Sequence, residues 1–232
     1  MNRIPGLAAA LLTALPLAAL ADVQNRPVSG FSGVRLAVPG KMEVIQSGTE
    51  SLTVEGSAED LAKVETVVEN GVLHIRTVEK FNWHWSPKLK FTVNVKNLDH
   101  LGISGSGDIM AKALKAGPIK LAISGSGNIN IPALEADSAV VAISGSGDVS
   151  LAGRAGSVDS HISGSGDIKA EKLEARNVKV AISGAGGVKV WARETLKVRV
   201  AGSGDVRYYG DPSVEKTIAG SGSVKRLGAN PT

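Results

Sequence analysis

The sequence contains no cysteine and very few aromatic residues, which make up 3% of the chain. The lack of cysteine excludes disulfide bonds, a lipid-modified cysteine and thiolate metal sites. The scarcity of aromatic rings leaves small aliphatic side chains to form the core. Neither sign of charge dominates, since 26 Lys and Arg stand against 22 Asp and Glu. No basic stripe with interleaved aromatics occurs, so a nucleic-acid partner is not expected.

Residues 1–21 have the features of a secretory signal peptide. A positive charge at Arg3 precedes an almost entirely apolar run from Leu7 to Leu20, and Ala19-Leu20-Ala21 fits the small-x-small cleavage pattern. The run is shorter than the roughly 20 residues that span a bilayer. We therefore expect an exported protein, periplasmic, at the cell surface or secreted, that meets the membrane only through its cleaved signal peptide.

A short Gly-rich motif recurs through residues 100–226. Its first copy is Ile103-Ser104-Gly105-Ser106-Gly107-Asp108, and six further copies place their first glycines at 125, 145, 164, 184, 202 and 220. A period of 18 to 20 residues is too regular for a flexible Gly/Ser linker and is typical of a solenoid. Flanks such as Ile119–Ile123 alternate apolar and polar residues, which indicates strands with one buried face.

The period predicts the fold class, an all-β parallel β-helix with coils of about 20 residues. We expect each repeat to close one coil of three short strands and three bends. Stacking then pairs each strand in parallel with its equivalent one coil away, about 4.8 Å distant, and lines like aliphatic residues into interior ladders.

The repeated glycines and the Asp or Asn after them form a predicted structural turn column. A sharp corner requires positive φ and leaves little room for a Cβ, and the Asp or Asn can hydrogen-bond the turn backbone. A column of metal ligands is the weaker alternative, because neutral residues interrupt it, and we expect no metal and no cofactor. The column in the first four copies is Gly105, Gly107, Asp108, Gly125, Gly127, Asn128, Gly145, Gly147, Asp148, Gly164, Gly166 and Asp167.

Residues 22–99 lack the motif and are expected to form a β-rich part of the same domain that caps the solenoid. Asn70-Gly71 between two apolar runs predicts a hairpin, and Ser57 before an acidic pair predicts the start of a short helix. Residues 100–226 then form the repeat β-helix, and residues 227–232 form a tail.

Trp83, His84 and Trp85 are the candidate ligand-binding residues. Side chains at i and i+2 share a face of a strand, and paired indoles offer a platform for sugar rings or for a partner protein. The alternative is that these side chains cover the open end of the rod or pack under a loop.

No catalytic residues are predicted. The four histidines lie in no metal-ligand spacing and beside no nucleophile motif. His161 stands where other coils have alanine, so it is expected to face outward in a structural or solvated role. Two alternatives stay open: a polysaccharide lyase or hydrolase with converging carboxylates, and a purely structural envelope protein.

The order of these elements resembles a known family. Phe31-Ser32-Gly33-Val34, then Asn70-Gly71-Val72-Leu73-His74-Ile75, then the serial Ile-Ser-Gly-Ser-Gly-Asp copies are similar to the putative auto-transporter adhesin, head GIN domain family, over about Val28 to Arg226. The resemblance implies a right-handed parallel β-helix and a non-catalytic role in adhesion. The expected partner is an envelope or extracellular polysaccharide or a surface protein.

Overall fold

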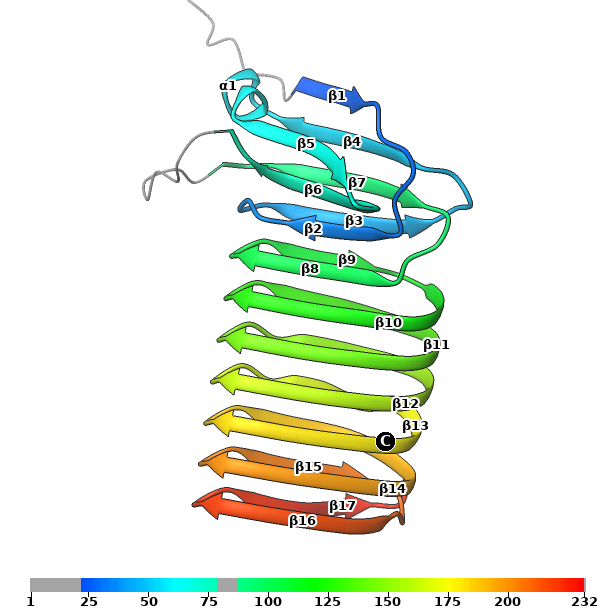
Figure 1. Ribbon diagram of the computed structural model, residues 1–232, viewed down its shortest axis with the longest axis vertical. Helices are drawn as coiled ribbons and strands as arrows, with labels where there is room; N and C mark the ends of the chain where they lie inside the picture. The colour runs from blue at the N-terminus through cyan, green and yellow to red at the C-terminus, as the bar shows by residue number, and fades with distance from the viewer. Residues whose placement is uncertain (1–21, 79–86, 232) are drawn as a thin grey trace, which may run out of the picture.

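The computed structural model describes residues 22–78 and 87–231, which form a stack of β-rungs (Figure 1). This confirms the all-β solenoid and its spacing of about 20 residues. The repeat part contains β8 (His100–Gly105), β9 (Asp108–Ala111), β10 (Leu114–Gly125), β11 (Asn128–Gly145), β12 (Val149–Gly164), β13 (Ile168–Gly184), β14 (Gly187–Gly202), β15 (Asp205–Tyr209), β16 (Ser213–Gly220) and β17 (Ser223–Gly228).

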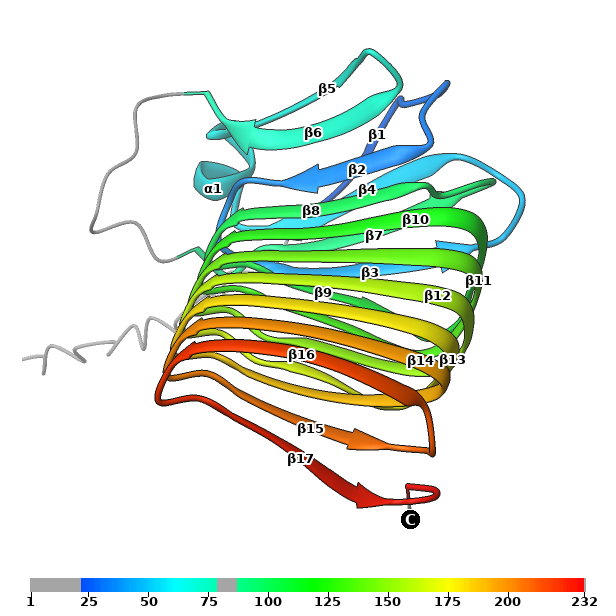
Figure 2. The same cartoon turned by 60° about the horizontal axis from the view of Figure 1, so that its bottom comes forward.

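Each coil has two broad faces, joined by a sharp Gly-Ser-Gly corner at one edge and a rounded bend at the other (Figure 2). The expectation of three short strands per coil is wrong for β11 to β14, because each of these strands continues around the bend from one corner to the next. The strands of successive coils stay paired through the bend, because differences in coil length appear there as register shifts, such as the one between Ala170 and Glu174. The two faces therefore stay in register from coil to coil.

Aliphatic ladders fill the interior between the two faces. Ile123, Ile143 and Ile162 stack on one face, and Ile129 and Val149 stack on the other, with exposed fractions of at most 2%. Burial of one such side chain contributes about 1.5–3 kcal/mol. The stability of the rod is thus spread along it, one rung at a time.

The corner glycines allow the coils to approach one another closely. Gly145 has a φ of +129°, and a Cβ at this position would lie 2.3 Å from the carbonyl oxygen of Gly125 in the preceding coil. The backbone N–H of Ser146 donates to that same oxygen at 2.9 Å. Only glycine combines the positive φ with this backbone approach.

The Asp and Asn residues after the corners join successive coils. The Asp108 side chain accepts a hydrogen bond from the backbone N–H of Asn128 at 3.2 Å, and the Asn128 side chain accepts one from Asp148 at 3.2 Å. Asp148 and Asp167 accept equivalent bonds from the next coil. These contacts give the column a structural role.

The N-terminal elements extend the stack in an order that differs from the chain. They are β1 (Asp22–Arg26), β2 (Gly33–Leu36), β3 (Lys41–Gln46), β4 (Ser51–Gly56), α1 (Ala58–Ala62), β5 (Val64–Glu69), β6 (Val72–Thr77) and β7 (Lys90–Val95). The rung made by β2 and β3 pairs in parallel with β8 and β9 on one side and with β6 and β7 on the other. Antiparallel β5, β4 and β1 complete this end of the rod.

Local signals in this part formed as expected. Asn70, with a φ of +51°, and Gly71 turn the β5–β6 hairpin. The Ser57 hydroxyl accepts from the backbone N–H of Asp60 at 3.1 Å and caps α1. The predicted signal peptide at 1–21 and the candidate residues Trp83, His84 and Trp85 lie outside the described residues. Within the described ranges, no helix has the length and apolar character needed to cross a membrane.

The stacked corners can be tested by a matched pair of substitutions. Gly105 has a φ of +119°, but a Cβ there would meet no atom within 4 Å, whereas Gly145 faces a backbone oxygen. We expect Gly105→Ala to cost about 1–3 kcal/mol from backbone strain, and Gly145→Ala to cost roughly a further 1–3 kcal/mol from the clash. Urea unfolding of both variants gives the comparison. Equal losses would mean that stacking does not require glycine.

Ser160 allows a second stability test because its hydroxyl is fully buried in an interior ladder and has no hydrogen-bond partner. Its ladder neighbours are Val141 and Val180. Ser160→Ala removes the unsatisfied group, so the free energy of unfolding should rise by about 1 kcal/mol. Ser163→Ala, which changes an exposed serine of the same strand, should stay within about 0.5 kcal/mol of the parent. A destabilised Ser160→Ala protein would show that the hydroxyl has a partner.

Candidate functional site

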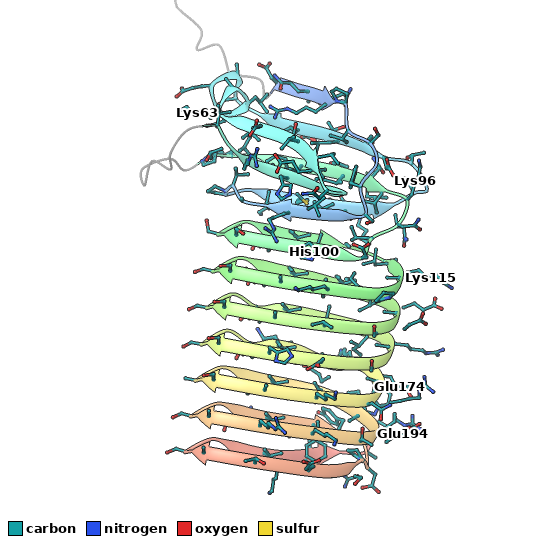
Figure 3. The ribbon with its side chains drawn as sticks, viewed as in Figure 1. Lys63, Lys96, His100, Lys115, Glu174 and Glu194 are labelled. Atoms are coloured by element: carbon teal, nitrogen blue, oxygen red, sulfur yellow. The ribbon has the colours of Figure 1, made fainter. Side chains whose placement is uncertain are left out.

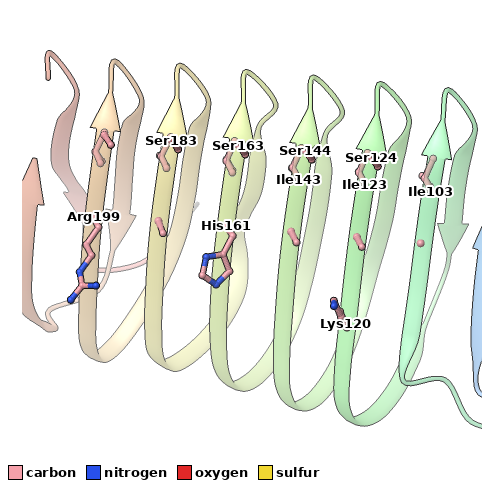
Figure 4. Close-up of a pocket in the computed structure, with 18 of the residues that line it drawn as sticks. Ile103, Lys120, Ile123, Ser124, Ile143, Ser144, His161, Ser163, Ser183 and Arg199 are labelled. Carbon is pink, nitrogen blue, oxygen red and sulfur yellow. The ribbon is translucent and has the colours of Figure 1, made fainter. Parts of the chain in front are cut away.

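A shallow groove of about 870 Å³ runs along one face of the rod. It crosses the strands, from Arg35 on β2 to Thr217 on β16 (Figure 4). Its length therefore spans every coil of the repeat, and we call it the axial groove.

Two columns of outward-facing residues form the floor and one side of the groove. The floor column has small residues at four of its positions, Gly102, Ala122, Ala142 and Ala181, and the others are His161, Arg199 and Thr217. Exposed serine hydroxyls beside the corners form the neighbouring column, namely Ser104, Ser124, Ser144, Ser163 and Ser183. The groove is hollow because the floor side chains are small, and its side presents a ladder of hydroxyl donors and acceptors.

The charged residues that line the groove are all basic. Lys120 and Arg199 lie toward opposite ends, with His161 between them (Figure 4), and Arg35 lies beyond Lys120. No aspartate or glutamate occurs among the described lining residues. The electrostatic character of the groove therefore favours an anionic or hydroxyl-rich ligand.

His161 faces outward, as the sequence predicted, with 54% of its side chain exposed. Its Nε2 lies 2.9 Å from the Asp159 carboxylate. Ser163 follows on the same face, but no hydrogen bond joins its hydroxyl to the imidazole in the described structure. An Asp-His-Ser relay requires that contact between nucleophile and base, so these three residues do not form one here.

Four basic side chains gather at the N-terminal end of the groove, and we call them the basic cluster: Arg35, His74, His100 and Lys120. Arg35 is paired in register with His74 on one side and with Gly102 on the other, and His100 is paired with Lys120. A Cβ on Gly102 would lie 3.2 Å from His100 Nε2 and 3.7 Å from Arg35 Nε, so both side chains reach over this glycine.

The basic cluster perturbs the titration of His100, which lies where the repeat meets the N-terminal rungs (Figure 3). Partial burial, followed by the charges of Arg35 and Lys120, lowers the pKa of His100 below its ordinary value, and the Asp99 carboxylate opposes the shift more weakly. His100 Nε2 is buried without a hydrogen-bond partner. A neutral imidazole beside two permanent cations is the result.

A second hollow, of about 1300 Å³, lies at the rounded bend. Lys115 and Glu174 lie along this edge of the rod (Figure 3). The charged side chains along this edge alternate in sign from coil to coil, and Lys115 Nζ contacts Glu135 at 3.1 Å. Because such neighbours neutralise one another, this edge is less suited to a charged ligand than the axial groove.

Throughout residues 22–78 and 87–231, no three histidine or acidic side chains gather as a metal site would require.

The turn column predicted from the sequence lies at the corner edge of the coils, beside the serine ladder and outside the lining of the groove. Sequence reasoning missed the lining residues Arg35, Lys120 and Arg199. The repeat alignment places Arg199 in the same column as Ala122 and Ala142, which was an available signal. No comparable signal existed for Arg35, because the pairing of β2 with β8 does not follow chain order.

The stacked coils with an axial groove on one outer face define a β-solenoid. The chain belongs to the putative auto-transporter adhesin, head GIN domain family, whose model matches residues 30–212. This confirms the resemblance drawn from the motifs.

Solved structures share the whole architecture. A putative adhesin from Bacteroides fragilis has a TM-score of 0.85 and 25% identity, over 89% of this chain and 97% of its own. A putative lipid binding protein and a putative adhesin, both from Parabacteroides distasonis, have TM-scores of 0.71 and 0.68 and identities of 25%, each over 90% of this chain and 98% of its own. No curated protein matches the chain.

The basic cluster leads to a prediction about pH. Because the folded-state pKa of His100 lies below its unfolded-state value of about 6.5, the unfolded chain binds the proton first as the pH falls. The stability associated with neutral His100 is therefore present above about pH 6.5 and is lost below it. We expect Arg35→Gln and Lys120→Gln each to raise the pKa of His100, measured by NMR titration of its ring protons. An unchanged pKa in both variants would show that burial alone lowers it.

Proposed function

We propose that this protein is an exported, non-catalytic binding module of the cell envelope that holds an extended polysaccharide along its axial groove. The observation that carries the proposal is the groove itself, which presents a serine in five successive coils and a small floor residue in four of them. A repeating polymer laid along the rod axis meets similar contacts from coil to coil.

The chemistry of the lining supports a sugar ligand. Serine hydroxyls donate and accept hydrogen bonds, and the small residues of the floor let a ring approach the sheet closely. Binding of an acyl chain is favoured by an apolar cleft or cavity that covers most of its surface, whereas the interior of this rod is filled by aliphatic ladders and the groove is open and partly polar. The solved relatives are named as adhesins or as a lipid binding protein, which supports a binding role at the envelope.

The residues that line the axial groove also help to decide between a binding module and a polysaccharide-active enzyme. Glycoside hydrolysis by the common mechanism uses two carboxylates on either side of the scissile bond. The described groove lining supplies cations and hydroxyls instead. A binding role therefore fits this surface better than cleavage does.

The proposal is tested by incubating the purified protein with a panel of insoluble envelope and matrix polysaccharides. Both the protein retained on the solid and the oligosaccharide released are measured. We expect retention without release. Release of oligosaccharide would replace the binding module with a polysaccharide-active enzyme.

Two variants on neighbouring coils locate the binding surface. Ala142→Trp fills the floor of the groove and should weaken retention at least about tenfold, equivalent to ~1.4 kcal/mol. Ser150→Trp adds the same bulk to the opposite face of the next coil and should leave retention unchanged. Equal retention of the two variants would move the binding surface away from the groove.

The contribution of Trp83, His84 and Trp85 stays a prediction. If these residues extend the sugar-binding surface, Trp83→Ala and Trp85→Ala should each weaken retention in the same assay. Parent-level retention in both variants would remove the tryptophans from the proposed site.

A further inference from the structure

The basic cluster at the N-terminal end of the groove places two permanent cations, Arg35 and Lys120, beside His74 and His100. These four side chains form no ion pair in the described structure. The nearby Asp99 carboxylate is bound by the Ser32 hydroxyl at 2.8 Å. Opposite-charge pairs stabilise a sheet, and the basic cluster makes none, so ion pairing within the fold gives no reason for this arrangement.

A neighbouring arginine shows how the same sheet pairs a cation when structure requires it. Arg76 is two residues from His74 on β6, and its guanidinium contacts Glu65 at 2.7 Å and Glu69 at 3.0 Å. Arg35, on the adjoining strand, has no such carboxylate. Unlike Arg76, the basic cluster therefore has no carboxylate side chain paired with it in the described structure.

Arg35, Gly102 and Lys120 line the N-terminal end of the axial groove, so an anion that enters the groove there would lie beside the basic cluster. Arg35 Nε and His100 Nε2 both lie within 4 Å of the position that a Cβ on Gly102 would occupy, and His100 Nε2 is a buried polar atom without a partner. Lys120 occupies the next rung beside His100, and His74 lies beyond Arg35 in the same column. Guanidinium, imidazolium and ammonium groups arranged in this way donate charge-assisted hydrogen bonds to an oxyanion.

We propose that Arg35, His74, His100 and Lys120 form a binding site for one anionic group, a carboxylate, sulfate or phosphate, carried by an acidic polysaccharide that lies in the axial groove. The inference rests on the proposed function for the identity of the polymer, while the anion site itself stands on the cluster. The charged group occupies the N-terminal end of the groove, and the rest of the polymer extends along the floor column toward Arg199.

Protonation of His100 and binding of the anion support each other. An anion beside the imidazole favours its charged form, so binding should raise the pKa of His100, and by linkage the anion should bind more tightly as the pH falls. The charged and titratable groups that act on His100 are Arg35 from β2, His74 from β6, Lys120 from β10 and its chain neighbour Asp99.

The first experiment titrates the protein with inorganic sulfate and phosphate while the ring signals of His100 are followed by NMR. We expect saturable shifts and a raised pKa for His100. Arg35→Gln and Lys120→Gln should each weaken anion binding roughly tenfold or more. Arg76→Gln, outside the lining of the axial groove, is the matched control and should bind as the parent does. Equal weakening in all three variants, or no saturable shift, would overturn the site.

The second experiment compares polygalacturonate with its methyl-esterified form, which lacks the charges. Tighter binding of the charged polymer that disappears in Arg35→Gln supports the site and its ligand class. Binding of both polymers with equal affinity would overturn the anion site while leaving the axial groove as a sugar-binding surface. Saturable binding of the inorganic anions without binding of either polymer would retain the anion site and overturn its assignment to an acidic polysaccharide.

Discussion

The fold depends on the close approach of the backbone at the Gly-Ser-Gly corners. The N–H after each first glycine donates to the carbonyl oxygen of the equivalent glycine one coil earlier, at distances between 2.8 and 3.0 Å. Because a Cβ at Gly125 or Gly164 would lie within 2.3 Å of that oxygen, the corner fixes both the identity of the residue and the separation of the coils. The interior ladders, the serine ladder and the groove floor all follow from the register set there.

A surface built in this way has an unusual property, because every residue in a column has the same backbone geometry. Function can therefore be introduced by substituting a single position in one coil. His161 and Arg199 replace the alanine of their column and place basic side chains in the groove, while the strands around them keep their pairing. An outward-facing position tolerates a histidine because solvent can hydrogen-bond the ring, whereas the inward-facing Ser160 hydroxyl is left without a partner.

The repeat was readable from the sequence because its determinants are local and periodic. The glycine spacing predicted the coil length, the alternation in Ile119–Ile123 predicted the buried face, and Asn70-Gly71 predicted the hairpin. The unbroken strands around the bend were not predicted, since no residue type marks a bend that keeps its hydrogen bonds. The basic cluster was also hidden, because it joins β2, β6, β8 and β10 through pairings that skip along the chain.

The rounded bend, unlike the sharp corner, can accommodate changes in the length of a coil. Between Ala170 and Glu174 the bend accommodates a change in coil length, whereas one extra residue within a face would turn every later side chain to the opposite surface. Gain or loss of sequence is therefore confined to one edge of the rod. Duplication of a coil would lengthen the axial groove by one rung, so the length of the groove changes in whole coils and never by a fraction of one.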